Sequence, residues 1–552
     1  MKYLLIAFMA FSLSSFSQKE FTNPLDIPMY LSGSFAELRS NHFHSGIDIK
    51  TNETIGHPVF AVADGWVSRI KVSPWGFGHA IYITHNNGYT SVYAHLESFN
   101  EGLSQLLLDE QYKRKSFSVD MYLKKGVYLV KQSDLIAFSG NTGGSGGPHL
   151  HFELRETVSQ KPINPLQFNF DIEDTIPPTF KALVAYTQSD KKFFTPIFSK
   201  GDFWIKDTVE VNDNFEIGIV TKDKSNNSDN RLGVNKIDYY LNDILMYSYK
   251  NESFSYSETR YANAHIDYGV YKTKSIRIQK MFVDPGNHLS CYSVLGKYKQ
   301  INCNDFVKGR IEIQDSKNNK SVLRFIVKRL CTKSKEMEMT QSQCTSVSKF
   351  KYNEDNRFKS SDIDLYIPKG ALYSDIDFCF QKSENLDYIG GYVYSIHRET
   401  TALHKKMTLK IKRPKIKDVL SQKLIIVKKN NKNIKAKKTT LDGVFLKTRI
   451  KELGDYTIAI DTLSPRIKFE SFSLDSSKSF LEFSISDNLS GISSYNGYID
   501  GQWVLFQYDY KTKRLFYRLD KHLRKENKNR NVLIKVSDAV GNVSSFKYTV
   551  KY

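Results

Sequence analysis

The chain has 552 residues, enough for roughly three or four domains of ordinary size and too many for a single core. Its formal net charge is +20, yet no nucleic-acid recognition module is apparent, so the charge does not indicate nucleic-acid binding. Alternating apolar and polar runs recur along the chain, and 13% of the residues are aromatic, which favours a mainly β protein over a helical or disordered one.

The first residues are typical of a secretory signal peptide. Met1 and Lys2 precede an apolar run over residues 3–11, and small residues follow up to Ser17. A membrane-spanning helix needs about 20 apolar residues, roughly twice the length of this run. We therefore expect residues 1–17 to be removed and the mature chain to be exported, either to the periplasm or to the outside of the cell, without a transmembrane span.

Residues 18–172 are predicted to form a first domain of antiparallel strands. Two Asx-Gly turns each separate alternating runs, which is the usual signal for a hairpin. The expected hairpins join 58–63 to 66–70 around Asp64-Gly65, and 80–85 to 89–96 around Asn87-Gly88. Residues 97–122 interrupt this pattern with leucines at roughly helical spacing, so they are predicted to be a surface insertion with one helix.

The remainder of the chain is predicted to form three β domains. Similar linkers, Asp174–Pro178 and Asp461–Pro465, each precede an alternating strand, and a weak internal repeat follows each linker. These features predict immunoglobulin-like β-sandwiches at 175–335 and 463–552, with a lysine-rich β domain at 345–461 between them. After residue 170 the sequence shows no metal-ligand spacing and no acid/base pair. We therefore interpret these domains as binding, spacing or assembly modules.

Basic residues are concentrated in the middle β domain. Between Lys405 and Lys438 there are fourteen Lys or Arg residues and a single acid, Asp418. Such a surface would attract a polyanion, for example an envelope polymer or an anionic membrane surface. The alternative is a set of solvated lysines on exposed strands, where lysine also discourages edge-to-edge aggregation.

The chain has five cysteines, all of them after residue 290, so no thiolate is available for a metal site in the first domain. An odd number leaves at least one thiol unpaired or paired between chains. Two disulfides are possible in an oxidising compartment. Proximity in sequence favours Cys291–Cys303 and Cys331–Cys344.

A glycine-rich loop at 140–147 leads into a short predicted strand that carries His149 and His151. Alternate side chains of a strand share a face, so the two imidazoles point the same way. His44 and Asp48 lie upstream, and zinc accepts both imidazole nitrogen and carboxylate oxygen. Three protein ligands plus water make a catalytic site, so His44, Asp48 and one histidine of the pair would suffice. The other histidine would then handle the proton or the developing charge.

Four ordered motifs carry a resemblance to a known family. They are His44-Ser-Gly-Ile-Asp48, Ala61-Val-Ala-Asp-Gly-Trp-Val67, Tyr93-Ala-His-Leu96, and Ser139 to Thr142 continuing through Pro148-His-Leu-His-Phe-Glu153. Together they resemble the lysostaphin/LytM-type zinc endopeptidases, peptidase family M23. The resemblance implies an antiparallel β-sheet fold with one zinc ion held by His44, Asp48 and His151. It also implies that His95 and His149 are the catalytic pair.

The resemblance further implies that the substrate is the peptide part of bacterial peptidoglycan. The sequence therefore predicts an exported zinc metalloendopeptidase that hydrolyses peptidoglycan cross-links through a metal-activated water. The alternative is a non-hydrolytic cell-wall-binding scaffold or an activator of another hydrolase. A protease for proteins would share the same site and differ only in its substrate.

Overall fold

The computed structural model describes residues 21–187, 190–211, 215–295, 305–330, 346–431, 433–473, 480–518 and 529–550. Regular structure over these ranges is mostly β strand, which confirms the mainly β fold class. The predicted signal peptide, residues 1–17, lies outside the described residues. Among the helices that the structure describes, none combines the length and the apolar character needed to cross a membrane.

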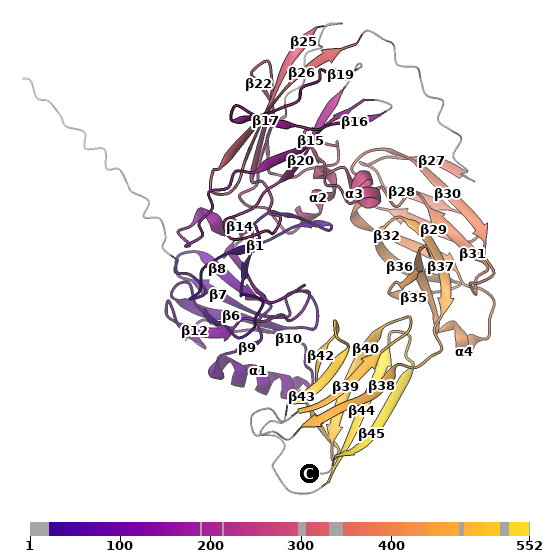
Figure 1. The fold of residues 1–552 in the computed structure, drawn as a ribbon. Helices are drawn as coiled ribbons and strands as arrows, with labels where there is room; N and C mark the ends of the chain where they lie inside the picture. The colour runs from indigo at the N-terminus through magenta and orange to yellow at the C-terminus, as the bar shows by residue number, and fades with distance from the viewer. Residues whose placement is uncertain are drawn as a thin grey trace, which may run out of the picture.

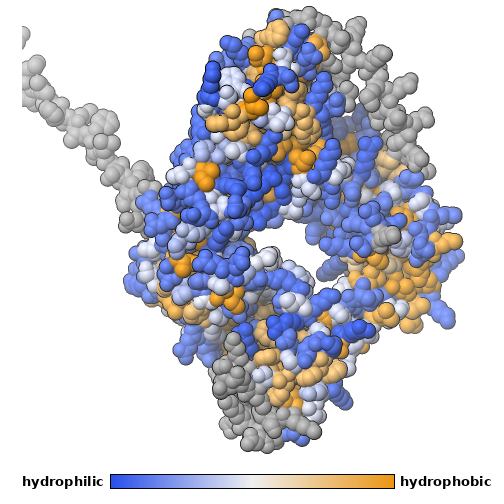
Figure 2. All heavy atoms as spheres, in the orientation of Figure 1, coloured by the Kyte–Doolittle hydropathy of each residue, from blue (hydrophilic) through white to orange (hydrophobic). Residues whose placement is uncertain are grey.

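The four largest hydrophobic cores of the described residues follow one another along the chain. Most of their residues fall within 21–172, 180–327, 350–460 and 467–550, and we refer to these segments as units one to four. The units lie around a ring in Figure 1, and the C-terminal unit (yellow) returns to the side of the first unit (indigo). The space-filling view shows an opening at the centre, bordered mainly by hydrophilic side chains (Figure 2).

Unit one is built on a large antiparallel sheet. In order across the sheet its main strands are β1 (Leu31–Gly33), β4 (Ile47–Lys50), β13 (His149–Glu156), β8 (Tyr89–Ala94), β7 (His79–His85), β6 (Gly65–Val72) and β10 (Val119–Tyr122). Two short strands extend it, β11 (Leu129–Val130) beside β6 and β14 (Pro162–Ile163) beside β13. Ile47, Ile49, Leu150 and Phe152 turn into the core, so their polar neighbours on β4 and β13 share the opposite face.

One of the two predicted hairpins is present and the other is not. Strands β7 and β8 pair as expected, with Thr84 opposite Thr90. The run at 58–63 does not pair with 66–70. Instead β5 (Pro58–Phe60) joins a separate three-stranded sheet with β12 (Leu135–Phe138) and β9 (Ser98–Phe99). The Asp64 carboxylate accepts the amide of Gln132, so the expected turn contacts a distant segment and does not close a hairpin.

The predicted insertion contains one helix, α1 (Glu101–Arg114). Asn100 caps it by accepting the amide of Leu103, and Lys115 ends it in the left-handed conformation. The helix is less superficial than expected, because Leu103 and Leu107 are buried in the core of unit one. The segment then continues as β10, which adds an edge strand to the large sheet.

Unit two is a β-sandwich of two sheets. One contains β16 (Lys191–Phe194), β15 (Thr179–Tyr186), β20 (Glu216–Lys222) and β23 (Gln279–Lys280). The other contains β17 (Ile197–Ser199), β18 (Asp202–Trp204), β26 (Lys320–Arg329), β25 (Phe306–Gln314), β21 (Lys236–Leu241), β22 (Ile244–Lys250) and β24 (Tyr292–Leu295), with β19 (Val209–Val211) beside β26. Both β18 and β19 run parallel to β26, unlike the antiparallel pairs elsewhere in this sheet. Short helices, α2 (Ala262–His265) and α3 (Tyr268–Lys274), follow β22.

Part of unit one packs into the core of unit two. A short hairpin of unit one, β2 (Leu38–Arg39) with β3 (His42–Phe43), belongs to the core of unit two. Phe35 and Phe43 both pack on Phe254, with ring centroids 5.4 and 5.6 Å away. The Phe43 amide also donates to Thr259 Oγ1 at 3.0 Å. The segment that leads to His44 is therefore held by unit two.

Units three and four each contain two packed sheets. In unit three these are β27 (Ser346–Phe350), β30 (Ile376–Glu384), β31 (Tyr392–Ile396), β37 (Gly454–Ile460), β33 (Leu424–Asn430) and β34 (Asn433–Ala436), against β28 (Asn356–Lys359), β29 (Ile363–Ile367), β32 (Ala402–Lys412), β36 (Phe445–Glu452) and β35 (Thr439–Asp442). In unit four they are β38 (Arg466–Ser473), β39 (Phe480–Ser486), β43 (Arg514–Arg518) and β42 (Gln507–Asp509), against β41 (Gln502–Val504), β40 (Ile492–Ile499), β44 (Arg530–Asp538) and β45 (Val543–Val550). The exact domain boundaries and the immunoglobulin-like type of units two and four stay predictions.

The expected disulfide between Cys291 and Cys303 is wrong. Cys291 is a free, buried thiol, because it faces the core of unit two and its sulfur lies 3.7 Å from the carbonyl of Ser253. Cys379 is disulfide-bonded. Cys303, Cys331 and Cys344 lie outside the described residues, so the Cys331–Cys344 pairing stays a prediction.

Gly46 gives a test of the close approach between β13 and the segment that leads into β4. A Cβ atom at Gly46 would lie 2.3 Å from the carbonyl oxygen of Phe152, whereas one at Gly146 would meet nothing within 4 Å. We expect Gly46→Ala to destabilise unit one by about 1–3 kcal/mol, since the backbone of β13 must move. Denaturant unfolding of Gly46→Ala beside Gly146→Ala measures this difference. Equal stability of the two variants would contradict it.

Candidate metal and catalytic site

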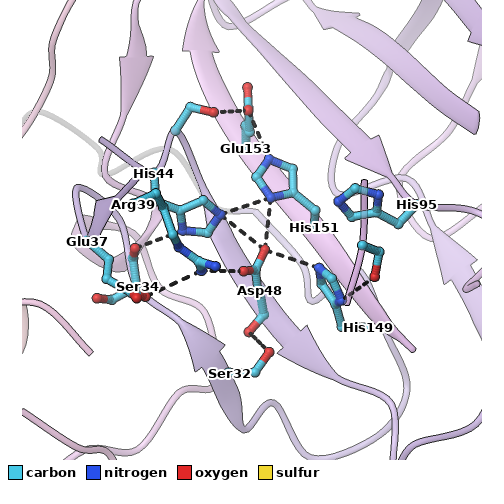
Figure 3. Close-up of polar contacts among 12 residues, drawn as sticks. Ser32, Ser34, Glu37, Arg39, His44, Asp48, His95, His149, His151 and Glu153 are labelled. Carbon is cyan, nitrogen blue, oxygen red and sulfur yellow. Dashed lines mark hydrogen bonds and ion pairs between the residues drawn. The ribbon is translucent and has the colours of Figure 1, made fainter. Parts of the chain in front are cut away.

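His44, Asp48 and His151 converge on one point on the polar face of the large sheet (Figure 3). Adjacent strands β4 and β13 place Asp48 directly opposite His151, and His44 lies just before β4. The Asp48 Oδ1 atom is 3.1 Å from His44 Nε2 and 2.9 Å from His151 Nδ1. The two imidazole nitrogens are 3.1 Å apart.

This set of atoms fits a metal ion. Ligands at about 2.1 Å in a tetrahedral site lie about 3.4 Å from one another, close to the three separations observed here. The three side chains are buried, and they combine two imidazoles with one carboxylate. Such a donor set is suited to a borderline divalent ion and leaves room in the coordination shell for water or substrate.

Hydrogen bonds on the far side of each imidazole orient the two histidines. His44 Nδ1 lies 2.9 Å from the carbonyl oxygen of Ser34, and His151 Nε2 lies 2.9 Å from Glu153 Oε1. A carbonyl or carboxylate oxygen only accepts a hydrogen bond here, so these nitrogens carry the N–H. The opposite nitrogens face Asp48 and are the ones available to a metal ion. Burial lowers the pKa of His151, but Asp48 and Glu153 outweigh it and raise the pKa to about 9, so a metal ion would displace the proton on Nδ1.

Glu153 is the centre of the supporting shell. Its side chain is 0% exposed, and Arg155 Nη2 lies 2.6 Å from Oε2. The hydroxyl of Ser45 also donates to Glu153, and the Tyr256 hydroxyl, from unit two, donates at 3.1 Å. Burial alone would raise the pKa of Glu153, but Arg155 and His151 outweigh it and hold the pKa at about 2. Glu153 is therefore a carboxylate and accepts a hydrogen bond from His151 Nε2.

Asp48 is held as a carboxylate in the same way. Burial opposes its charge, but His44, His149 and His151 together keep its pKa well below the usual range. Its second oxygen accepts a hydrogen bond from Arg39 Nη2 at 2.7 Å. Arg39 lies on β2, so the hairpin that packs into unit two also fixes the orientation of this carboxylate.

His95 and His149 lie beside the three converging residues, and their ring centroids are 4.9 Å apart. His149 Nδ1 donates to the carbonyl of Gly147 at 2.8 Å, while Nε2 lies 3.4 Å from Asp48 Oδ1. His95 has a φ of +60°, a strained conformation for a residue with a side chain, and its Nδ1 lies 2.8 Å from the carbonyl of Thr142. Burial, with smaller effects of His151 and His149, lowers the pKa of His95 to about 3, so its imidazole is neutral.

Unit four contacts the glycine-rich loop that precedes His149. The Lys511 ammonium donates to the carbonyls of Asn141 and Ser145. Nearby, Tyr510 packs on Trp75 with ring centroids 4.0 Å apart, and Arg518 pairs with Glu97 at 3.2 Å. A cavity of about 1120 Å³ lies between the loop and unit four, and its lining includes Lys511, Arg514 and Arg518.

The structure brings all five predicted site residues together, although they are spread over the sequence from residue 44 to residue 151. They are His44, Asp48, His95, His149 and His151. The supporting residues Arg39, Glu153, Arg155 and Tyr256 were not predicted as site residues. The alternation of β13 places Glu153 on the same face as His149 and His151, so this signal was available in the sequence. Tyr256 had no such signal, because it reaches the site from another unit.

Two family models match the chain. The model described as peptidase family M23 matches residues 42–105, and the model described as a Zu5-like domain matches residues 347–461. The M23 match contains His44, Asp48 and His95. His149 and His151 lie beyond the matched residues.

Among curated relatives, the DD-carboxypeptidase/endopeptidase Mpg of Neisseria meningitidis is 30% identical over 165 residues, which is 30% of this chain and 29% of that protein. The peptidoglycan DD-endopeptidase ShyA of Vibrio cholerae is 32% identical over 134 residues, 24% of this chain and 25% of that protein. The chain thus spans less than a third of the length of these relatives. Among solved structures, the catalytic domain of lysostaphin from Staphylococcus simulans is 26% identical, covering 25% of this chain and 90% of that chain, with a TM-score of 0.19.

Glu153 gives a test of the supporting shell. We expect Glu153→Gln to lower metal affinity about 10- to 100-fold, because the neutral amide no longer stabilises the His151 tautomer that faces Asp48. Competition with a metal chelator measures the affinity. The matched control is Glu156→Gln, an exposed position on the same strand. Tyr256→Phe, which leaves the carboxylate in place, should lower the affinity less. Unchanged affinity in a folded Glu153→Gln variant would contradict this role.

Proposed function

Because unit one carries a domain of peptidase family M23, we propose that this chain is an exported zinc endopeptidase that hydrolyses the peptide cross-links of bacterial peptidoglycan. The observation that carries the proposal is the convergence of His44, Asp48 and His151, each oriented by a buried partner. The matched relatives include proteins named for endopeptidase activity on peptidoglycan. Their similarity is confined to a quarter to a third of this chain.

In this proposal His44 Nε2, Asp48 Oδ1 and His151 Nδ1 hold the zinc ion. Zinc at this position would polarise the scissile carbonyl and lower the pKa of a water molecule towards neutrality. The protein residues hold Asp48 as a carboxylate and orient all three donors, and zinc binding would displace the proton on His151 Nδ1. Ser34 and Glu153 fix the two imidazole tautomers, and Arg39 fixes the carboxylate.

His149 and His95 supply proton transfer and charge stabilisation in the proposed reaction. His149 Nδ1 donates its hydrogen to Gly147, so Nε2 is the basic nitrogen and faces the reacting groups near Asp48. His95 Nδ1 faces the carbonyl of Thr142, so in its neutral form Nε2 is likewise free to accept a hydrogen bond. After taking up a proton, His149 becomes a donor to the developing oxyanion or the leaving amine, whereas the low pKa of His95 keeps that ring an acceptor until negative charge develops beside it.

The alternative function is a cell-wall-binding scaffold or hydrolase activator that keeps this site without hydrolysing peptides. The complete set of ligands and both flanking histidines favours hydrolysis. Envelope localisation and the binding of an envelope polyanion by the lysine-rich unit stay proposals. Lys428 is not available for such binding, because it is buried and lies 3.5 Å from Glu452.

The catalytic pair gives the decisive test. We expect His149→Ala and His95→Ala each to lower peptide release from purified peptidoglycan about 10²- to 10⁴-fold, which is the usual contribution of a positioned acid/base group. Zinc content should stay at one ion per chain, because neither residue is a ligand in the proposal. Mass analysis of the released fragments identifies the bond that is cleaved.

The matched control for that test is His42→Ala, since His42 is exposed and lies two residues before His44. Its activity should equal that of the unchanged protein. If the unchanged, zinc-loaded protein releases no peptides, the endopeptidase proposal is wrong and the scaffold function is favoured. If His149→Ala and His95→Ala are fully active, the assigned roles are wrong.

Lys511 gives a separate test of the contact between unit four and the glycine-rich loop. We expect Lys511→Met to lower peptide release by about two- to fivefold, a modest effect because exposed charged contacts contribute little free energy. The physical reason is greater freedom of the loop that positions His149. Lys513→Met, two positions along the same exposed turn, is the control. Full activity of Lys511→Met would show that this contact does not position the loop.

A further inference from the structure

Two groups of three aspartates lie outside the site described above. One is Asp174, Asp223 and Asp315 in unit two, and the other is Asp461, Asp487 and Asp538 at the start of unit four. Within each group one carboxylate oxygen from every residue lies within 4.8 Å of the others. The members of a group are separated by many residues in sequence, so no metal-ligand spacing in the sequence indicated either group.

The two groups occupy the same place in the two sandwiches. In each, the first aspartate belongs to the linker that enters the sandwich. The second directly follows a strand that pairs with the first strand, β20 beside β15 and β39 beside β38. The third lies at the turn between two paired strands, β25 and β26 or β44 and β45. The weak repeat in the sequence therefore corresponds to a repeated local structure.

An asparagine completes each arrangement in the same way. Asn319 Nδ2 donates to the carbonyl of Asp174 at 2.9 Å and to Asp315 Oδ2 at 2.7 Å. Asn542 Nδ2 donates to the carbonyl of Asp461 at 2.9 Å and to Asp538 Oδ2 at 2.6 Å. Each asparagine lies four residues after the third aspartate, so both turns tie the linker to the same edge of the sandwich.

Buried oxygens in both groups have no hydrogen-bond partner. Asp223 is 3% exposed and Asp461 is 1% exposed, and the Oδ1 atom of each is unpartnered. Ser225 Oγ, two residues after Asp223, is also buried and unpartnered. Over the part of the chain that the structure describes, no Lys, Arg or His nitrogen forms an ion pair with any of the six carboxylates.

Such oxygens are costly to bury unless a cation compensates them. In unit two, burial and then the charges of Asp315 and Asp174 raise the pKa of Asp223 to about 8. Lys317 acts on Asp174 and Asp315 only at a distance. Three converging carboxylates with unused lone pairs form a site that is electrostatically incomplete by itself.

We propose that each sandwich binds one Ca²⁺ ion at its group of three aspartates. The donors are carboxylate oxygens without imidazole or thiolate, which suits a hard cation and disfavours zinc. Ca²⁺ takes six to eight oxygens in flexible geometry, and backbone carbonyls and water supply the rest. The first aspartate of each group lies in a linker, so the ion fixes the angle at which each sandwich joins the preceding unit.

Titration of the purified, zinc-loaded chain with Ca²⁺ tests the proposal directly. Isothermal titration should give two bound Ca²⁺ ions per chain, and Mg²⁺ at the same concentration should not replace them. Asp223→Asn and Asp487→Asn should each leave one ion, and the double variant none. Asp229→Asn, whose side chain is 99% exposed and follows the same strand, is the control and should bind two. No binding by the unchanged chain at millimolar Ca²⁺ overturns the proposal, and so does binding of two ions by the double variant.

Thermal unfolding separates a cation site from a merely structural role. In excess EGTA, Asp223→Asn should melt at or above the temperature of the unchanged chain, because a neutral amide replaces a repelled, buried carboxylate. In Ca²⁺ the order should reverse, because only the unchanged chain gains the full binding free energy. A variant that melts equally below the unchanged chain in both conditions would show that Asp223 is only structural and would overturn the proposal.

Discussion

Glu153 carries a negative charge at a point in unit one that water does not reach, and the geometry of the proposed metal ligands follows from how that charge is compensated. Arg155 forms an ion pair with one carboxylate oxygen, and the other oxygen accepts a hydrogen bond from His151 Nε2. A buried carboxylate that lost either partner would be strongly destabilised. Because Nε2 is committed to Glu153, Nδ1 of His151 is the nitrogen that faces Asp48. One buried ion pair therefore determines which atom of His151 is available as a ligand.

The same charge connects unit one to unit two. Tyr256 donates to the second oxygen of Glu153, and Arg155 lies 4.9 Å from the centroid of the Tyr256 ring. On the opposite side of the site, the β2–β3 hairpin carries Arg39 to Asp48 while Phe35 and Phe43 pack into the core of unit two. Both flanks of the metal-binding residues thus depend on unit two. An isolated unit one would expose these aromatic rings and lose the Tyr256 hydroxyl.

Local patterns predicted the parts of the site that lie within single strands. The alternation around His149 and His151 predicted both the strand and the shared face. The assignment of His151 as a ligand and His149 as a catalytic residue rests on the resemblance to family M23 and stays a prediction. The prediction of a hairpin between β5 and β6 was wrong. The chain leaves the three-stranded sheet after β5, residues 61–64 contact residues 131–134, and the chain then enters the large sheet at β6. The predicted disulfide of Cys291 was wrong because the distance between two cysteines along the sequence says little about which thiol is buried. Tyr256 and the aspartate groups were missed because their members meet only through tertiary contacts.

The ring arrangement relates the linkers to the glycine-rich loop. Lys511 reaches Asn141 across 370 positions of sequence, so the approach of unit four to the loop before His149 depends on every joint between these residues. At the two joints that carry an aspartate group, the linker backbone is tied to the sandwich by Asn319 or Asn542. A small change of angle at either joint, acting over the length of a unit, would move Lys511 away from the loop. Rigid linkers are therefore the physical condition for unit four to form one wall of the cavity beside the glycine-rich loop.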